Sequence, residues 1–279
     1  MEKRILTVQD VSCVGQCSLT VALPILSAFG LETAVLPTAV LSNHTGGFKE
    51  WTFADLNAEI PKINAAWGRQ GIDFDCVYTG YMGSAEQIDF VLDIFRERKR
   101  AGGKIIVDPV MADNGKLYAG FDENFVGEMK RLVGAADVIM PNITEACFLV
   151  GAEYKDGCQT PGYIEDLIGR LKEICGGTIV LTVVSFSPDK LGVAVCEGEE
   201  IEYRFENFVN RKSHGTGDIF ASVFTGAYAC GESPADAAQF AAQVVIESIL
   251  RTMGDDDHWY GVRFEKALPM IMKKYGGGR

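Results

Sequence analysis

Short apolar runs rich in β-branched residues alternate with longer amphipathic stretches along most of the chain. Runs of this length fit strands, whereas apolar positions that recur every three or four residues fit helices. Several runs are apolar throughout, as in strands that are covered on both faces. The alternation predicts an α/β fold with a central, mainly parallel sheet flanked by helices. The expected strands are residues 5–11, 34–41, 76–80, 104–110, 138–140 and 178–184.

Helical periodicity covers the stretches between most of these runs. Residues 190–205 differ, because their pattern fits a β-hairpin with its turn at Glu197, Gly198 and Glu199. The expected helices are residues 18–29, 85–101, 123–134, 143–149, 162–175 and 234–252.

Composition narrows the class of protein. With 279 residues and 47% hydrophobic content, the chain can build a sizeable core, and we interpret residues 1–279 as a single domain. The formal net charge of -12 argues against a partner that is a nucleic acid or an anionic membrane, since both require basic surface. No apolar stretch is long enough to cross a bilayer, and residues 1–4 lead directly into a strand pattern. We therefore expect a cytoplasmic protein.

One short segment combines small residues with a carboxylate directly before an apolar helical pattern. It reads Gly215, Thr216, Gly217 and Asp218. Backbone amides at a helix N-terminus are unpaired donors, and glycines let them approach an anion closely. Asp218 would then be placed to take the proton from an attacking hydroxyl group. The alternative is an ordinary helix start after a glycine turn.

Other polar residues fall where predicted parallel strands end, which is the edge where open α/β sheets bind ligands. No Gly-x-x-x-x-Gly-Lys-Ser/Thr segment occurs, since Gly115-Lys116 is followed by Leu117, so a P-loop kinase is disfavoured. We hypothesise that one cleft brings together Asp10, Ser12, Tyr81, Asp108, Asn142 and Asp218.

Five segments together resemble the ribokinase-like superfamily, in the family's own order along the chain. They most resemble its vitamin-kinase branch, the pyridoxal and pyridoxamine kinases. The resemblance implies a three-layer sandwich with a small lid-like β element. The segments are residues 215–218, which resemble an anion hole and catalytic base, residues 42–45 and 79–84 on the acceptor side, and residues 107–111 and 141–145.

The same resemblance implies a reaction. ATP would phosphorylate the 5'-hydroxymethyl group of pyridoxal, pyridoxine or pyridoxamine, with Asp218 as general base. The ATP phosphates would lie over residues 215–217, with Mg2+ bridging them. Family members are commonly homodimers, which implies a homodimer here, and dependence on a monovalent cation such as K+ is left open.

Roles on the nucleotide side follow residue by residue. Asn142 and Glu145 match a segment associated with Mg2+ and phosphates, although the same pair could form a helix capping box. Asp108 could join the cation cluster or be a turn residue before Pro109. Two further matches are looser: Thr182 and Ser185 resemble nucleotide-side residues, and Arg211 is a basic residue that would offset phosphate charge.

On the acceptor side, Thr45 and Tyr81 resemble residues that contact the substrate ring, and Ser12 is assigned to the same site. Asp10 departs from the family, which commonly carries serine there. A carboxylate could pair with a protonated ring nitrogen or an amine. The preferred vitamer therefore stays open.

Two alternative functions remain at this point. A hydroxymethylpyrimidine kinase would share the fold and a similar ring substrate, but such enzymes often have Cys where Asp218 stands. A non-catalytic vitamin-binding protein of the same fold is the other, and the intact Gly215, Gly217 and Asp218 argue against it.

Overall fold

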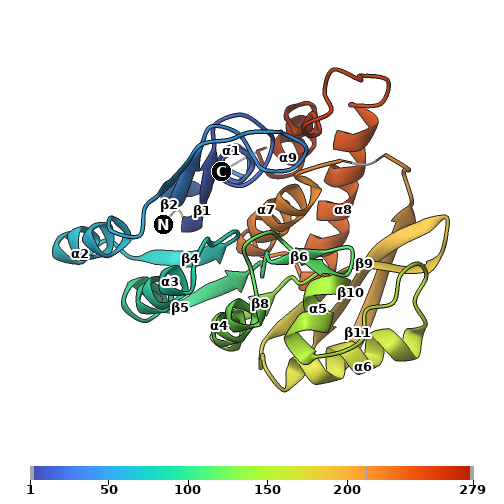
Figure 1. Ribbon diagram of the computed structural model, residues 1–279, viewed down its shortest axis with the longest axis horizontal. Helices are drawn as coiled ribbons and strands as arrows, with labels where there is room; N and C mark the ends of the chain where they lie inside the picture. The colour runs from blue at the N-terminus through green and yellow to red at the C-terminus, as the bar shows by residue number, and fades with distance from the viewer. Residues whose placement is uncertain (1–2, 212, 277–279) are drawn as a thin grey trace.

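A nine-stranded mixed sheet runs through the middle of the molecule, which is described here by a computed structural model for residues 3–211 and 213–276 (Figure 1). The strand order is β11-β10-β9-β8-β5-β4-β1-β2-β3. Pairing is parallel in the centre and antiparallel at both edges, where β3 joins β2 and the β10-β11 hairpin joins β9. The strands are β1 (Arg4–Ser12), β2 (Glu32–Leu41), β3 (Phe53–Asp55), β4 (Phe74–Thr79), β5 (Lys99–Val107), β8 (Val138–Ile139), β9 (Thr178–Ser187), β10 (Lys190–Glu197) and β11 (Glu200–Asn207).

Helices cover both faces of this sheet, because alternate strand residues point to opposite sides. In β4, Val77 packs into one apolar cluster, whereas Cys76 and Tyr78 pack into the other. The first cluster is completed by α2 (Ile60–Gln70), α3 (Ala85–Arg98), α4 (Glu123–Gly134), α5 (Ile143–Val150) and α6 (Pro161–Lys172). The second is completed by α1 (Leu19–Ala28), α7 (Thr216–Ala229), α8 (Pro234–Leu250), the 3-10 helix η1 (Phe264–Lys266) and α9 (Leu268–Tyr275).

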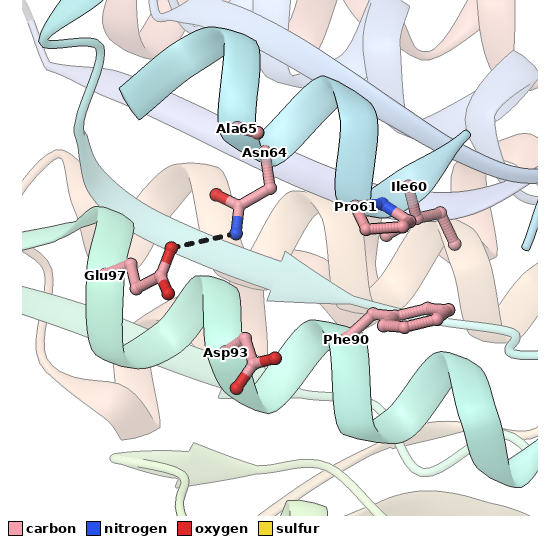
Figure 2. A pocket seen from close by; sticks show the side chains of 7 residues that line it. All are labelled: Ile60, Pro61, Asn64, Ala65, Phe90, Asp93 and Glu97. Atoms are coloured by element: carbon pink, nitrogen blue, oxygen red, sulfur yellow. Dashed lines mark hydrogen bonds between the residues drawn. The ribbon is translucent and has the colours of Figure 1, made fainter. Parts of the chain in front are cut away.

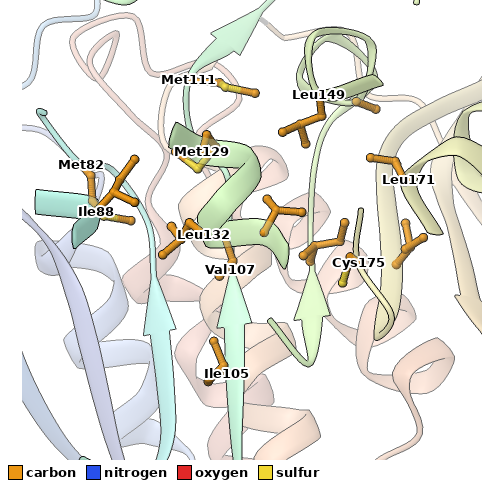
Figure 3. Close-up of a cluster of buried hydrophobic side chains, with 14 of the residues drawn as sticks. Met82, Ile88, Ile105, Val107, Met111, Met129, Leu132, Leu149, Leu171 and Cys175 are labelled. Carbon is orange, nitrogen blue, oxygen red and sulfur yellow. The ribbon is translucent and has the colours of Figure 1, made fainter. Parts of the chain in front are cut away.

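The first cluster interlocks the helices with the central strands. Figure 3 shows Met129 and Leu132 of α4 above Val107 of β5, with Leu149 of α5 and Leu171 of α6 to one side. Each of these side chains is fully buried. A fully buried side chain of this size contributes about 1.5–3 kcal/mol of transfer free energy. This packing fixes the carboxyl ends of β5 and β8, where the candidate site lies.

The predicted three-layer α/β architecture is confirmed, and a small antiparallel element is present beside the main sheet. It consists of β6 (Ala112–Asp113) and β7 (Lys116–Leu117). The Ala112 carbonyl oxygen accepts a hydrogen bond from Asn142 Nδ2 at 2.9 Å, so this element lies beside the start of α5. A second short strand, β3, lies at one edge of the main sheet. No helix among the described residues is long and apolar enough to cross a membrane.

Candidate active site

A cleft of about 570 Å³ opens at the carboxyl ends of β5, β8 and β9, beside the N-terminus of α7. It collects most residues that we assigned to the nucleotide side and to catalysis. These are Asp108, Asn142, Glu145, Thr182, Arg211, Gly215, Thr216, Gly217 and Asp218.

The N-terminus of α7 is built for close approach by a ligand. Gly215 is its N-cap in the left-handed conformation (φ 77°), and no side chain caps the first turn. A β-carbon on Gly217 would meet no atom within 4 Å, so this residue faces open space. The backbone amides of this first turn are donors without intrahelical partners. An anion in the cleft would meet these donors directly.

Asp218 lies in that first turn, partly exposed to the cleft. Burial raises the pKa of its carboxyl group to about 7, the Ser18 backbone opposes this by a hydrogen bond, and the charge of Asp10 adds to it. A carboxylate with a pKa close to neutrality can accept a proton at physiological pH and release it afterwards.

Two further carboxyl groups face the same space. Burial, followed by the charges of Glu145 and Asp218, raises the pKa of Asp108 well above its usual range. Burial also raises the pKa of Glu145 to about 8, against hydrogen bonds from the backbone of Asn142, Met111 and Ala112. Carboxyl groups that are buried together without a positive partner are typical of a site that binds a cation.

Asn142 and Glu145 form the capping box that was one of the two readings of this pair. Asn142 Oδ1 accepts from the Glu145 amide at 2.9 Å, and Glu145 Oε2 accepts from the Asn142 amide at 2.8 Å. Glu145 Oε1 also accepts from the Met111 amide at 3.2 Å. Both side chains thus hold the start of α5 and the β6 segment in place. Any contact of Glu145 with a cation would be made alongside this structural role.

The donor set fits a hydrated cation better than a protein-only cage. No group of three or more His, Cys, Asp or Glu side chains among the described residues is close enough to hold a metal. Mg2+ normally keeps several waters and binds through one or two carboxylates plus substrate phosphates. Within the described residues, no side-chain hydrogen bond occupies the Asp108 carboxylate, which lines the cleft. Asp108 therefore fits as the direct or water-mediated partner of Mg2+ beside the phosphates.

Thr182 and Ser185, at the end of β9, differ in whether they line the cleft. Thr182 lines the cleft, and its backbone amide donates to the Pro141 carbonyl oxygen at 2.9 Å. Ser185 is not among the cleft residues, because its amide donates to Gln159 Oε1 and its hydroxyl to the Ser187 carbonyl oxygen. Between them, Val183 has a φ of 64°, and the pairing with β10 shifts register in this region. The loose resemblance that assigned Ser185 to the nucleotide side does not place it at this cleft.

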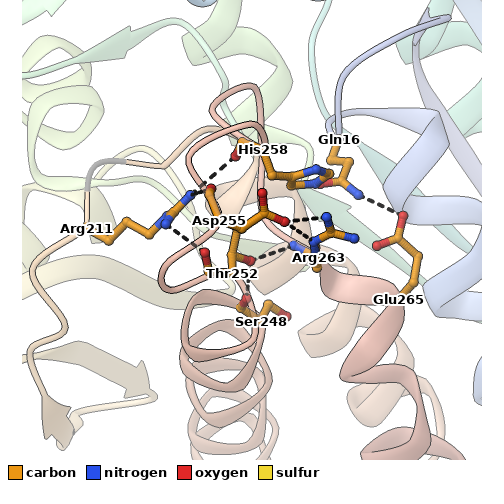
Figure 4. Close-up of polar contacts among 8 residues, drawn as sticks. All are labelled: Gln16, Arg211, Ser248, Thr252, Asp255, His258, Arg263 and Glu265. Atoms are coloured by element: carbon orange, nitrogen blue, oxygen red, sulfur yellow. Dashed lines mark hydrogen bonds and ion pairs between the residues drawn. The ribbon is translucent and has the colours of Figure 1, made fainter.

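Arg211 lines the cleft, but its guanidinium group has other partners. Figure 4 shows it pointing into the segment between α8 and η1. Nη1 donates to the Thr252 carbonyl oxygen at 2.7 Å, and Nη2 donates to those of Asp255 and His258 at 3.1 and 3.3 Å. Arg211 therefore anchors the loop that leads into Gly215, and we assign its charge a positioning role.

The cleft does not include the residues assigned to the acceptor side, which are Asp10, Ser12, Thr45 and Tyr81. The single cleft that we expected to join Asp10, Ser12 and Tyr81 to Asp108, Asn142 and Asp218 is therefore not found as one pocket among the described residues. Asp10 is buried and accepts a hydrogen bond from Ser12 at 2.9 Å. Burial raises its pKa, while hydrogen bonds from Ser18 and Ser12 oppose the change. The Tyr81 pKa is raised by burial and then by Asp10. Asp10, Ser12, Tyr81 and Asp218 are thus electrostatically connected at one place.

Thr45 is exposed on the rim of this region, between two residues that hold its loop. The buried His44 donates from Nε2 to the Tyr260 carbonyl oxygen at 2.7 Å, since its Nδ1 accepts from the Gly46 amide at 2.9 Å. A β-carbon on Gly46 would lie 2.8 Å from His214 Nδ1. The loop therefore lies against the segment that precedes the anion hole.

Sequence reasoning did not identify the apolar end of the cleft. This wall combines α8 with the end of β11 and the loop after it, and its residues are Phe208, Val209, Ala242, Val245, Ile246 and Ile249. The signal was present, because α8 is apolar on more than one face. Gln16 and Ser18 were missed as well, since polar residues in a short loop carry no distinctive pattern.

A second hollow, of about 230 Å³, lies between α2 and α3 (Figure 2). Its polar groups include Asn64, whose Nδ2 donates to Glu97 at 3.0 Å, and the carboxylate of Asp93. It has no glycine-rich helix N-terminus, and it does not contain Asp108, Glu145 or Asp218. The cleft beside α7 is therefore the candidate active site.

Comparisons with known proteins place the chain in a family. The profile of the phosphomethylpyrimidine kinase family matches residues 23–259. A Bacteroides thetaiotaomicron protein, provisionally described as a phosphomethylpyrimidine kinase and crystallised with pyridoxal, is 37% identical, with 97% of this chain and 96% of that chain covered and a TM-score of 0.91. Pyridoxal kinase from Lactobacillus plantarum is 31% identical, with 98% and 97% covered and a TM-score of 0.91.

Among curated relatives, the pyridoxine/pyridoxal/pyridoxamine kinase of Bordetella pertussis is 26% identical over 265 residues, which is 89% of each chain. The chain belongs to the phosphomethylpyrimidine kinase family, as a kinase that groups with the pyridoxal kinases of the ribokinase-like superfamily.

Proposed function

We propose that this kinase transfers the γ-phosphoryl group of ATP to the 5'-hydroxymethyl group of a B6 vitamer, with Asp218 as general base. The observation that carries the proposal is the position of Asp218. It lies in the first turn of α7 at the nucleotide cleft, and its pKa responds to Asp10 on the acceptor side. One carboxylate thus stands between the two regions that the reaction must join.

The nucleotide would lie along the cleft with its phosphates over residues 215–217. The amides there would stabilise negative charge on the transferred group, which is where electrostatic stabilisation counts most in phosphoryl transfer. The apolar wall of α8 would pack against the adenine ring. Thr182 at the end of β9 would contribute a polar contact to the nucleotide.

Mg2+ would be held near Asp108, with Asn142 and Glu145 organising the backbone around it. When bound, the cation would neutralise charge on the phosphates and hold them in line for transfer. Asp108 would orient the cation and its waters. Glu145 would keep β6 and α5 in the positions that shape this part of the cleft.

On the acceptor side, Asp218 would accept the proton of the 5'-hydroxyl group as its oxygen attacks the γ-phosphorus. Asp10 would recognise the ring through a protonated nitrogen or an amine, with Ser12 holding the carboxylate. Tyr81 would line one wall of the ring pocket, and Thr45 would contact ring substituents from the rim. This arrangement predicts a preference for vitamers that present a positive group to Asp10.

The direct test is phosphorylation by purified protein with ATP and Mg2+. Pyridoxal, pyridoxine, pyridoxamine and hydroxymethylpyrimidine are compared as acceptors, with Asp218→Asn and Asp218→Ala as controls. We expect turnover of a B6 vitamer that falls by roughly 10²–10⁴-fold in both variants, with nucleotide affinity retained. Near-native turnover in Asp218→Asn would disprove the assignment of the base.

The family profile, phosphomethylpyrimidine kinase, is consistent with a pyrimidine acceptor, and hydroxymethylpyrimidine is the pyrimidine that the sequence left open as an alternative. Turnover of the pyrimidine alone would establish this alternative. A homodimer, a cytoplasmic location and stimulation by K+ are also expected from the resemblance. Light scattering, fractionation of cells and turnover in K+ against Na+ would check these three expectations.

A further inference from the structure

Gln16 lies in the loop of residues 13–18 between β1 and α1, named the acceptor loop because it follows Asp10 and Ser12. Gln16 itself is outside the residues assigned to either substrate. Its carbonyl oxygen packs against the anion hole, because a β-carbon on Gly215 would lie 1.7 Å from it. Two residues along the loop, the Ser18 backbone faces the Asp218 carboxylate closely enough to lower its pKa. The loop therefore contacts the start of α7 at two points.

The Gln16 side chain reaches in the opposite direction, into the segment between α8 and α9. Figure 4 shows it between His258 and Glu265. Gln16 Oε1 lies 2.7 Å from His258 Nε2, and Gln16 Nε2 donates to Glu265 Oε1 at 2.7 Å. Since the Gln16 amide nitrogen is used by Glu265, its oxygen must accept from His258 Nε2-H. Gly261 completes the contact, because a β-carbon there would lie 2.8 Å from the Gln16 β-carbon.

The same segment also holds Arg211, which lies between β11 and α7. The His258 carbonyl oxygen accepts from Arg211 Nη2 at 3.3 Å, and the Thr252 carbonyl oxygen accepts from Arg211 Nη1 at 2.7 Å. Arg263 stiffens the segment from within, because its Nε donates to Asp255 at 2.8 Å and its amide to Thr252 Oγ1 at 2.9 Å. Arg211 precedes Gly215 by four residues, so this chain of contacts returns to the anion hole.

The contacts of Gln16 with Gly215 and His258, and those of Arg211 with His258 and Thr252, thus link the start of α7 to the segment between α8 and η1. The buried His258 has a lowered pKa because of burial and the charges of Arg263 and Arg211, so its imidazole stays neutral with one ring N-H. That N-H is the one donated to Gln16. A displacement of the acceptor loop would have to move either the anion hole or the segment that anchors Arg211.

We propose that Gln16 is a positioning residue that couples the acceptor loop to the anion hole, so that acceptor and nucleotide strengthen each other's binding. The proposal rests on the function proposed above. Coupling of this kind is reciprocal, since each ligand must change the affinity of the other by the same factor. The residue touches neither substrate directly and acts through Gly215 and His258.

The test exchanges the two partners of one hydrogen bond. Gln16→Glu keeps the acceptor for His258 but turns the donor toward Glu265 into a repelling oxygen. Glu265→Gln alone keeps the bond, because the new amide oxygen still accepts from Gln16. In the double variant Gln16→Glu/Glu265→Gln, the amide at 265 donates to the carboxylate at 16 and restores the contact.

Two quantities are measured for each variant: kcat and KM for both substrates, and the affinity for a non-hydrolysable ATP analogue with and without the vitamer. We expect Gln16→Glu to lower kcat/KM by roughly 3- to 30-fold and to bring the ratio of the two affinities close to one. Glu265→Gln should remain near native, and the double variant should regain most of the loss.

Native turnover and native mutual strengthening in Gln16→Glu would overturn the proposal, as would a double variant no better than Gln16→Glu. If Gln16→Glu does not fold, Gln16→Met replaces it, with loss of the mutual strengthening as the expected result and its retention as the contrary one. A wild-type protein that phosphorylates no vitamer would instead refute the proposed function, which separates the two failures.

Discussion

The carbonyl oxygen of Gln16 occupies the space that a β-carbon on Gly215 would need, at a distance of 1.7 Å. Gly215 also has a φ of 77°, which side chains other than glycine rarely adopt. Gly217, two residues further on, has neither constraint, since a β-carbon there meets nothing within 4 Å. The two glycines of the motif therefore have different reasons to be glycine.

This difference predicts opposite outcomes for two matched variants. Gly215→Ala should lower the melting temperature by at least about 3 °C, because it adds backbone strain and a clash. Gly217→Ala should leave the melting temperature nearly unchanged but raise KM for ATP, because its methyl group enters the space assigned to the phosphates. Thermal unfolding and steady-state kinetics distinguish the two, and equal melting temperatures would contradict the prediction.

Turnover should depend on pH through Asp218, whose pKa lies at about 7. The general base works only when deprotonated, so kcat/KM should rise with pH and level off above neutrality. The midpoint of a pH profile measured at low ATP and low vitamer concentration checks this. A flat profile between pH 5.5 and 8.5 would argue that another group limits the rate.

The pH dependence of the stability of the unliganded protein tests the raised pKa of Asp218 independently. An aspartate in the unfolded chain loses its proton near pH 4, whereas folded Asp218 keeps its proton up to about 7. Between these values the unfolded state binds fewer protons, so Asp218 costs stability as the pH rises. Asp218→Asn removes this cost, and its gain in melting temperature over wild type should grow from pH 4 to pH 8. A difference that is constant with pH would show that the pKa is not raised.

Substitutions at Asp108 and Glu145 should have different effects, because we assign Asp108 to Mg2+ binding and Glu145 to a structural role. Glu145→Gln places an amide against the backbone donors of Asn142 or Met111, which should cost about 1–3 kcal/mol of stability. Asp108→Asn should leave stability unchanged or higher, but raise the Mg2+ concentration for half-maximal rate about tenfold or more. Chemical unfolding and a Mg2+ titration are the measurements, and an unchanged Mg2+ requirement in Asp108→Asn would contradict its assignment.

Asp10 should decide which vitamer is preferred. Asp10→Ser replaces the carboxylate by the residue common in related kinases and removes its pairing with a positive group. We expect KM for pyridoxamine to rise more than KM for pyridoxal, since charge-assisted hydrogen bonds are the stronger ones. Comparison of kcat/KM for the two vitamers in both proteins checks this, and an unchanged ratio would remove Asp10 from ring recognition.

Removing the hydroxyl group of the buried Tyr78 should not destabilise the protein. This hydroxyl lies near Ser222 and Gln9, which both lower its pKa against a larger effect of burial. Even so, neither this oxygen nor Gln9 Oε1 nor Ser222 Oγ has a hydrogen-bond partner among the described protein atoms. Removing an unpaired buried hydroxyl relieves its desolvation cost, so Tyr78→Phe should be neutral or stabilising. A clear loss of melting temperature would instead indicate an ordered water between these groups.

Most of the fold could be predicted because its elements carry strong local patterns. The helix Glu123–Gly134 matches its predicted range, and the β10-β11 turn falls at Gly198 and Glu199. Helix α2 was missed, since Pro61 falls within its range and a proline would interrupt a helix interior. In the structure Pro61 instead starts the helix, because its missing amide hydrogen would be unpaired there anyway.

The candidate site was predictable where local sequence fixes the geometry, as at Gly215 and Asp218. It was not predictable where a distant segment decides what a side chain does. Arg211 bonds to carbonyl groups more than forty residues away, and Ser185 is turned by the irregularity at Val183. Asn142 and Glu145 supported two readings from sequence, and the capping box alone is visible in the structure.

The outer strand β11 also bears on how molecules of this protein meet each other. One face of this strand, which ends the sheet, carries Glu200, Glu202, Arg204 and Glu206, and Arg204 already pairs with Glu202 at 2.7 Å. A strand from a second copy would have to bring the same carboxylates against these, so like charges would oppose continuation of the sheet. Charge on this edge thus protects the protein from assembling into sheets that extend from molecule to molecule.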